Sequence, residues 1–447
     1  MNIKTMTAVV ATAATGLVHA ATPQVTSVSM AQSSSSRLVT IDYTFTGEDA
    51  VITLDVQTNA PGGAWASIGG AAVCNAQGEV WKKVSNDGST HHITWRPDLS
   101  WPDHVIADGG ARAVITAWTL DNTPDYMVVD VSEAAQPNTQ RYYPSADSVP
   151  GGVSNGLYKT TTVLMRKIMA KDVMWTMGST SLESLGRIAD REATHQVSLT
   201  NNYYIGVYEV TQSQWSQVAT NSSIAANFTV ERFMRPMESV CYNEIRLKAN
   251  SNAEATAAEI ADYSWPKDPN PSSFLGLLRL KTGIDFDLPS EAQWEFAARA
   301  GNGVGYWNNG SAMQNAASDN NLNPLGRYAG NSASSPTGSA APSVGGTAIS
   351  GSYVQSAWGI YDMHGNVQEF CLDWNENDIT AHGGKVNIDP ADPAKTLSGV
   401  AGSQRVARGG SYALGAHYCR PAYRGNNTPT QRNTNIGFRV VCTAGLR

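Results

Sequence analysis

Residues 288–301 read LPSEAQWEFAARAG, and they predict the best-defined helix of the chain. Ser290 precedes Gln293 by three residues, which is the spacing of a capping box, where each side chain bonds the backbone N–H of the other residue. Gly301 stands where many helices end in a left-handed residue. A helix with a defined start and a defined end is therefore expected here.

The sequence on both sides of this helix is irregular. Residues 197–211, VSLTNNYYIGVYEVT, have the pattern of strands and lead into a short helix expected at 212–218. Residues 302–357 are mostly Gly, Asn, Ser and Ala, which predicts a long surface excursion rather than core. This part of the chain is predicted to be an α+β domain without a regular layout.

Residues 24–131 have a different pattern, in which short strands alternate polar and apolar side chains. The alternation is clear in VTIDYTF (39–45), VITLDV (51–56) and AVITAWTL (113–120), and turns containing glycine separate such runs. About seven short strands in roughly a hundred residues are typical of an all-β, immunoglobulin- or fibronectin-like sandwich. We assign four of its tryptophans to the core and to packing between strands rather than to a carbohydrate platform. The four are Trp81, Trp95, Trp101 and Trp118.

The first twenty residues predict a secretory signal peptide. Lys4 forms a short basic region, residues 8–18 are an apolar run of small residues, and Val18-His19-Ala20 is a small-x-small cleavage site. The run is too short for a membrane span, and no later stretch approaches the length of one. We therefore expect an exported protein, periplasmic, secreted or on the cell surface, with no membrane span.

The composition of the mature chain indicates its domain boundaries and argues against nucleic acid as a partner. We expect the sandwich at 23–135, a linker rich in Pro, Gly, Ser and Asn at 136–160, and the second domain at 161–447. Charged residues are 15% of the chain and the formal net charge is -7. No basic stripe is visible, so nucleic acid is not an expected partner.

The chain has five cysteines, an odd number. In an oxidising compartment some of them are expected to pair, and at least one must stay unpaired within a monomer. Their spacing does not determine the connectivity.

Seven short motifs of the second domain follow one another in an order that carries a resemblance. They are Met177-Gly178, YEVT (208–211), RPMESVCYNE (235–244), LPSEAQWEFAARAG, GIYDMHGNVQEF (359–370), RVARGGSY (405–412) and NIGFRVV (435–441). The succession resembles the sulfatase-modifying factor family, the formylglycine-generating enzymes and their bacterial relatives, over roughly Thr160 to Arg447. The resemblance implies a fold of low regular secondary structure, related to C-type lectins, in which a small core holds long loops.

The resemblance also implies a reaction. Catalytic members use O2 and a copper ion held by two cysteine thiolates to oxidise a cysteine of a client sulfatase to formylglycine, and soft thiolates do select Cu(I). Those cysteines stand two and seven residues after the Tyr of the GGSY-type motif, which here gives Leu414 and Cys419. A leucine cannot bind a metal, and Gln368 replaces an aromatic residue of the catalytic members. Copper is therefore not expected, and Ser411 and Cys419 are catalytic candidates only if an altered site is active.

The motif DMHGNVQE implies a calcium site by the same resemblance. The corresponding ligands are Asp362, Gly365, Val367 and Glu369, two carboxylates and two backbone carbonyls on a tight turn, and hard oxygen ligands suit Ca2+. The alternative is a turn at Gly365-Asn366 in which Glu369 pairs with an arginine such as Arg408 or Arg439.

Two further expectations come from the resemblance. Cys371 and Cys419 occupy positions where noncatalytic relatives carry cysteine, which implies a disulfide between them, while Cys241 and Cys442 are core thiols or a second pair. Residues 423–441 resemble the ligand-facing region of lectin-fold variable proteins made by diversity-generating retroelements. Polar side chains on a rigid loop form an adaptable recognition surface, and the alternative is a solvated loop over the core. The candidate surface residues are Tyr423, Arg424, Asn426, Asn427, Arg432 and Asn435.

The sequence therefore favours an exported two-domain protein whose second domain has lost copper catalysis and recognises an extracellular protein or glycan. The alternative is a formylglycine-generating oxidoreductase that acts on a sulfatase client through an altered site around Ser411 and Cys419. Iron-dependent sulfoxide synthases would need a cluster of histidines, which the scattered histidines of this chain do not offer.

Overall fold

The computed structural model describes residues 22–59, 63–106, 108–229, 231–248, 251–303, 305–332, 345–380, 386–388 and 404–445. The expected signal peptide, 1–20, lies outside them. The chain divides into two compact units, one made of Met1–Val128, Thr139–Asn155 and Ala444–Arg447, the other of Val129–Asn138 and Gly156–Thr443. None of the helices in the described residues has the length and apolar character needed to span a membrane.

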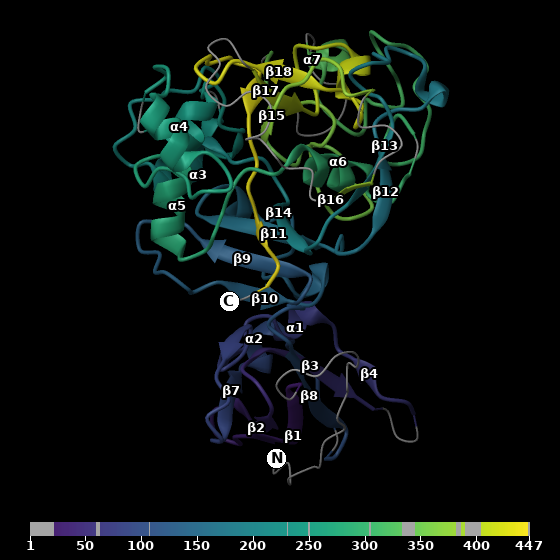
Figure 1. The fold of residues 1–447 in the computed structure, drawn as a ribbon. Coiled ribbons are helices and arrows are strands. Elements are labelled where there is room, and N and C mark those ends of the chain that lie inside the picture. Colours follow the sequence, from purple (N-terminus) through teal and green to yellow (C-terminus); the bar gives the residue numbers. More distant parts are fainter. Residues whose placement is uncertain are drawn as a thin grey trace. The chain divides into compact units, whose positions relative to one another are not determined.

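The first unit contains two antiparallel sheets (Figure 1). One has the order β1 (Gln24–Gln32), β2 (Val39–Thr46), β7 (His91–Trp95) and β5 (Gln77–Gly78). The other has the order β4 (Ala66–Ser67), β3 (Ala50–Thr58) and β6 (Lys82–Val84), and β8 (Ala111–Trp118) pairs with β3. Two one-turn helices, α1 (Gly70–Val73) and α2 (Pro97–Ser100), interrupt the strands.

The alternation of side chains explains why these segments form strands. In β2, Val39, Ile41, Tyr43 and Phe45 are buried and the residues between them are not, which is the period of two of a strand with one face in the core. β3 is buried along most of its length, as expected of a strand paired on both edges. The predicted all-β domain and its three clearest strands are confirmed.

The segment expected to be a linker, 136–160, contains secondary structure. It holds β10 (Arg141–Tyr143), which pairs with β9 (Tyr126–Asp130), and two 3-10 turns, η1 (Ala146–Ser148) and η2 (Gly156–Lys159). Ser145 and Ser148 form a capping box around η1. Serine, glycine and proline are typical of both linkers and capped turns, so composition alone did not distinguish the two.

The second unit is built on three small sheets (Figure 1). β11 (Thr162–Ile168), β14 (Tyr203–Gly206) and β20 (Val441–Thr443) pair in that order, and β12 (Met174–Met177), β13 (His195–Ser198) and β16 (Val386–Ile388) form the second sheet. The third has the order β18 (Gly425–Asn427), β17 (Arg405–Arg408), β15 (Gln368–Trp374) and β19 (Ile436–Gly437).

Short helices lie between these strands. The α-helices are α3 (Gln212–Val218), α4 (Ala257–Tyr263), α5 (Phe274–Thr282), α6 (Glu291–Arg299) and α7 (Ala329–Ser332). The tighter or wider turns are η3 (Ser181–Glu183), η4 (Arg232–Met234), η5 (Asn243–Leu247) and η7 (Ala416–Cys419). With strands and helices this short, the predicted domain of low regular secondary structure is confirmed.

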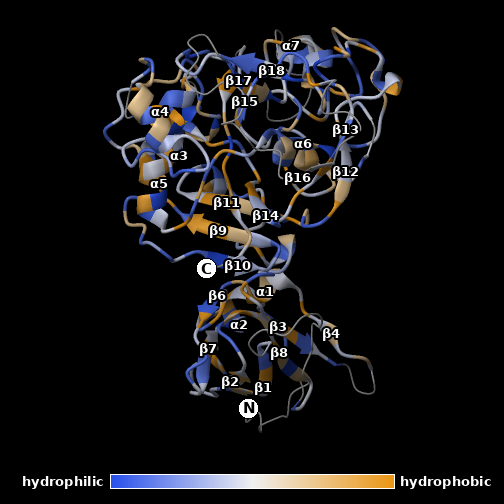
Figure 2. Ribbon diagram, viewed as in Figure 1, coloured by the Kyte–Doolittle hydropathy of each residue, from blue (hydrophilic) through white to orange (hydrophobic). Residues whose placement is uncertain are grey.

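Helix α6 forms where the capping signals predicted it. The Ser290 side chain accepts a hydrogen bond from the backbone of Gln293, whose side chain accepts one from the backbone of Ser290. Ala300 adopts the left-handed conformation, with φ 48°, and Gly301 follows at φ 88°. Trp294 and Ala297 are fully buried in the main core, which also contains Ile168 from the end of β11, a strand with both hydrophobic and hydrophilic residues (Figure 2). The predicted helix at 212–218, α3, is likewise confirmed.

The expectation of a long surface excursion at 302–357 is wrong for much of 305–332, and residues 304 and 333–344 lie outside the described part of the chain. Large side chains from this stretch form a second core cluster with Ala416 and Cys419. Its members from this stretch are Tyr306, Trp307, Met313, Leu322, Leu325 and Tyr328. The large residues are sparse among Gly, Asn and Ser, so the average composition concealed them.

Side chains replace regular secondary structure as partners of the backbone in this stretch. Asp319 accepts hydrogen bonds from the backbone N–H groups of Gln314, Asn315 and Asn321. Buried backbone groups must be paired, and short polar side chains supply the partners where no strand or helix does. An Asn- and Ser-rich sequence can therefore form part of a core.

Candidate functional site

Cys419, the retained sulfur position, lies at the end of η7 inside the second core cluster. Its side chain is buried among residues such as Trp307 and Tyr328, and its Sγ is 3.9 Å from the carbonyl oxygen of Gly415. Burial raises the pKa of the Cys419 thiol to about 12, although a backbone N–H of Ser411 acts in the opposite direction. At neutral pH the group is therefore a thiol, whereas metal binding and nucleophilic attack need the thiolate.

The other two positions of this loop supply no second metal ligand. Leu414 is partly buried and is held through its backbone, since its N–H donates to Ser411 and its carbonyl accepts from Ala329. The buried Ser411 hydroxyl accepts hydrogen bonds of 3.4 Å from Asn435 Nδ2 and from the Ala413 N–H. One protonated thiol and one leucine do not fit a two-thiolate copper site.

The predicted Cys371–Cys419 disulfide is absent from the structure. All five cysteines are free, and four of them are buried. Cys371 lies on β15 in the main core with Trp294, while Cys419 lies in the second cluster with Trp307. A disulfide needs Cα atoms within about 7 Å of each other. Two sulfurs that pack in different clusters do not meet this condition.

His364 holds the Cys419 loop in place, a role that the sequence did not reveal. Its Nδ1 donates to the carbonyl oxygen of Cys419 at 2.9 Å, and its Nε2 accepts the N–H of Asn308 at 3.1 Å. These partners require the neutral ring with its proton on Nδ1. Burial lowers the pKa of His364 to about 4, which favours the same form. In the sequence, the position of His364 within the DMHGNVQEF motif was the available sign of a structural role.

The turn of the expected calcium site is sharp, as its glycine predicted. Asp362 and Asn366 have φ of 59° and 62°, and Gly365 has φ of 105°. A Cβ at Gly365 would lie 2.1 Å from the carbonyl oxygen of Arg327, so no other residue fits there. The turn leads to Glu369, which is fully buried at the second position of β15.

Glu369 pairs with Arg439 rather than with Arg408. Arg439 Nε and Nη2 each donate to a different oxygen of the Glu369 carboxylate at 2.6 Å, and Trp294 Nε1 donates to it at 2.8 Å. A bidentate guanidinium and an indole N–H satisfy most of the hydrogen-bonding capacity of this carboxylate. The pairing expected under the alternative interpretation of the turn is therefore present.

Two more buried carboxylates lie close to this pair. Asp362 Oδ2 accepts the N–H of Gly351 at 2.6 Å, but Asp362 Oδ1 is buried without a hydrogen-bond partner. Burial raises the pKa of Asp362 to about 6. Glu209 accepts from Asn366 Nδ2 at 2.7 Å, and burial, together with the charge of Asp362, raises its pKa well above the usual value. Arg439 is thus the main counter-charge of an acidic cluster, defined as Glu209, Asp362 and Glu369.

Other charged residues of the second unit, inside and outside the motifs, form buried ion pairs. Arg420 binds both oxygens of Glu192 at 2.7 and 2.8 Å, and Arg424 binds both oxygens of Glu291 at 2.6 and 2.9 Å. Glu295, on α6, accepts from both Arg299 and Arg408. Charges enclosed in this way need close partners, because an unpaired buried charge is strongly destabilising. These pairs therefore connect the motifs of the second unit with the segments around them.

Most of this second unit matches a known family. Residues 161–444 match the sulfatase-modifying factor enzyme 1-like domain. The chain belongs to the sulfatase-modifying factor family. The formylglycine-generating enzyme of Streptomyces coelicolor is 34% identical over 165 residues, which cover 36% of this chain and 47% of that one. The chain thus spans about half the length of this curated relative.

Two other similar proteins have different names. A serine/threonine-protein kinase, Pkn1 of Chlamydia trachomatis, is 30% identical over 222 residues, covering 48% of this chain and 31% of that one. Among solved structures, Treponema denticola variable protein 1 aligns with a TM-score of 0.45 and 25% identity, over 63% of this chain and 96% of that one.

In this member of the family, the candidate recognition surface is smaller than expected. Arg424 and Asn427 are buried and bonded inside the protein, Arg424 to Glu291 and Asn427 to Gln431 and Asn433. The other four are exposed or partly exposed, namely Tyr423, Asn426, Arg432 and Asn435. Composition could not separate an arginine that faces solvent from one that pairs with a helix carboxylate.

Proposed function

We propose that this sulfatase-modifying factor family protein is exported, does not carry out copper-dependent oxidation, and acts in recognition of an extracellular protein or glycan. One observation carries the proposal. At the two positions where catalytic members hold copper, this chain has Leu414 and a buried Cys419 whose pKa is raised to about 12. The reaction needs two thiolates close together, and this loop offers none at neutral pH.

The recognition role is supported by the polar loops between β18 and β19. Arg432 is about one-third exposed and pairs with the buried Glu244, with 3.0 Å between Nε and Oε1, and Asn433 bonds Asn427 at 3.1 Å. Such bonds hold the loop in one conformation while Asn426 and Asn435 remain partly accessible. A rigid loop that presents amide and guanidinium groups is suited to binding polar ligands.

The competing proposal is oxidation of a sulfatase cysteine, the activity that the name of the Streptomyces coelicolor relative states. It would require Cys419 to leave the second core cluster and lose its proton. Ser411 could not compensate, because its hydroxyl is buried and hydrogen-bonded.

A Cu(I) competition titration tests the loss of the copper site. The reduced wild-type protein and the variant Cys419→Ser should give the same curve against a coloured Cu(I) chelator, because Cys419 is not a ligand. The other four thiols are common to both proteins, so only the role of Cys419 is compared. Weaker Cu(I) binding by Cys419→Ser than by wild type would show that Cys419 holds copper, contrary to the proposal.

We also propose that Ca2+ binds at the turn of the DMHGNVQE motif. The support is the buried Asp362 Oδ1, an acceptor without a partner among the described residues, together with the carbonyl groups of Gly365 and Val367, three and five residues further along the chain. The described residues contain no group of three His, Cys, Asp or Glu side chains that could hold a metal, but this ligand set has only two carboxylates. Glu369 would share its charge between calcium and Arg439.

If calcium binds here, EDTA should lower the melting temperature of the protein. A ligand that binds only the folded state adds about 2.7 kcal/mol at a hundredfold excess over its dissociation constant. Asp362→Asn should remove the difference between calcium and EDTA, and it leaves the Glu369–Arg439 pair intact. An unchanged melting curve of the wild type in EDTA would show that the turn binds no calcium.

A further inference from the structure

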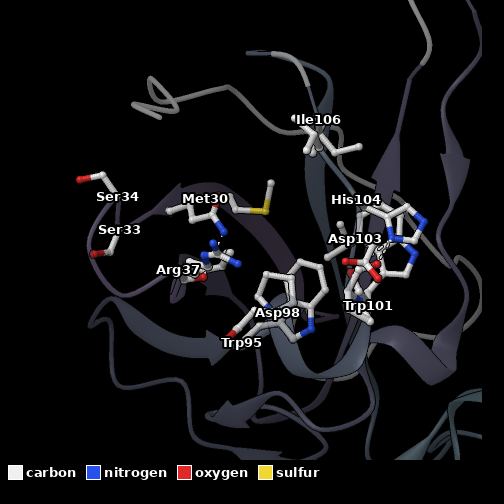
Figure 3. Close-up of a pocket in the computed structure, with 17 residues that line it drawn as sticks. Met30, Ser33, Ser34, Arg37, Trp95, Asp98, Trp101, Asp103, His104 and Ile106 are labelled. Atoms are coloured by element: carbon white, nitrogen blue, oxygen red, sulfur yellow. Dashed lines mark hydrogen bonds between the residues drawn. The ribbon is translucent and has the colours of Figure 1, made fainter.

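We propose that the first unit carries a binding pocket for a neutral saccharide, independent of the family site in the second unit. The pocket has a volume of about 600 Å³, within the range of small-molecule sites, and lies entirely within residues 30–111 (Figure 3). The turn between β1 and β2 forms one wall, and the loop after α2 forms the other.

An aromatic surface lines one side of this pocket. Trp101 and His104 stack with 3.8 Å between ring centroids and 11° between ring planes. His104 Nδ1 lies 2.7 Å from the carbonyl oxygen of Pro102, which fixes the ring against Trp101. Trp101 was assigned to packing from the sequence, yet it is only partly buried and lines the pocket. Flat aromatic faces are suited to the apolar C–H faces of a pyranose ring.

The floor of the pocket is rigid. The Trp95 indole N–H donates to the carbonyl of Ala72 at 2.9 Å and lies 3.0 Å from Ser100 Oγ, so the ring cannot rotate without loss of these bonds. Figure 3 shows Trp95 between the stacked aromatic pair and the residues of the opposite wall. A surface held in place before binding loses little entropy when a ligand arrives.

Polar groups with unused hydrogen-bonding capacity surround the aromatic surface. In the described part of the chain, no side-chain hydrogen bond is made by Arg37, Asp103 or Ser34, all of which line the pocket. Together they offer guanidinium donors, carboxylate acceptors and a hydroxyl. Hydroxyl groups of a sugar both donate and accept, so they can use all three.

The balance of charge favours an uncharged ligand. The charged lining residues are Arg37, Asp98 and Asp103, and Asp98 is already paired with Arg96 at 2.6 Å. Among the described residues, Arg37 and Asp103 then remain without a salt bridge, one positive and one negative group, so neither an anion nor a cation is attracted strongly. Val105, also in the lining, is 89% exposed, and such an apolar rim suits a ligand with both apolar and hydroxylated faces.

Saturation-transfer NMR on the full chain tests the proposal. The probes are the neutral oligosaccharides maltotriose, cellotriose, mannotriose and chitotriose, each at millimolar concentration. At least one should bind, and Trp101→Ala should weaken its binding by about tenfold because the aromatic surface is lost. The matched control is Trp65→Ala, a partly exposed tryptophan of the same unit that does not line the pocket and should leave binding unchanged.

Three results would overturn the saccharide pocket. They are the absence of transfer to all four sugars, equal binding by wild type and Trp101→Ala, and binding of N-acetyl-tryptophanamide in place of every sugar. The copper and calcium measurements do not affect this test, because no residue of the pocket belongs to the second unit.

Discussion

Replacement of Arg439 by methionine should destabilise the second unit by about 3–5 kcal/mol, since loss of one partner of a buried ion pair leaves an uncompensated charge. Arg439 is fully buried and is the bidentate partner of Glu369. It also donates to the carbonyl groups of Gly206 and Tyr361. Its loss would expose the acidic cluster of Glu209, Asp362 and Glu369 to mutual repulsion. Urea unfolding, followed by tryptophan fluorescence, measures the change.

Two controls separate the buried charge from loss of side-chain volume. The double variant Arg439→Met/Glu369→Gln should recover part of the stability, because a glutamine at position 369 carries no charge and can still accept from Trp294. Asp268→Asn removes a charge whose side chain is 89% exposed and should change stability by less than about 1 kcal/mol. Equal stability of Arg439→Met and Asp268→Asn would show that the buried Glu369–Arg439 ion pair contributes no more to the free energy of unfolding than an exposed charge does.

The elements that the sequence predicted well are those with local signals. Helix α6 has both cap residues within its own segment, and β2 alternates polar and apolar residues along its whole length. Each signal depends on residues a few positions apart, so the pattern is visible in one dimension. The motifs of the family added the fold of the second unit, because their order was specific.

The features that escaped prediction depend on residues far apart in the chain. Arg408 pairs with Glu295 across 113 positions and Arg420 with Glu192 across 228, and neither spacing has a pattern that single-sequence reasoning can detect. The second core cluster was hidden for a related reason, since its members, such as Trp307 and Tyr328, are scattered among small polar residues. Arg424 was expected at the surface because its partner, Glu291, lies 133 positions away in the sequence.

The disulfide prediction was wrong because it used the compartment and the resemblance but not the packing. The cysteines at 371 and 419 fill separate hydrophobic clusters, where each thiol behaves as a small apolar side chain. The loss of a sulfur at position 414 needed no knowledge of the packing, because Leu414 is identified by its spacing from Tyr412 in the sequence.

Restoring the missing sulfur should not restore the reaction. Leu414→Cys would place a second thiol in the loop, but Cys419 would stay buried, with its pKa still raised toward about 12. Gln368 would also remain where the catalytic members have an aromatic residue. Its side chain packs against Gly425, since a Cβ added to that glycine would lie 2.4 Å from Gln368 Nε2. We therefore expect this variant to convert far less peptide than a catalytic member of the family does under the same conditions.

The most direct test of the account is the mass of a sulfatase-type peptide after aerobic incubation with the reduced protein, Cu(I) and a reductant. Conversion of its cysteine to formylglycine lowers the mass of the peptide, so mass spectrometry reports turnover without a coupled assay. The account predicts that the wild-type protein leaves the peptide unchanged. Conversion by the wild type that is abolished in Cys419→Ser would contradict it and identify the chain as an oxidase.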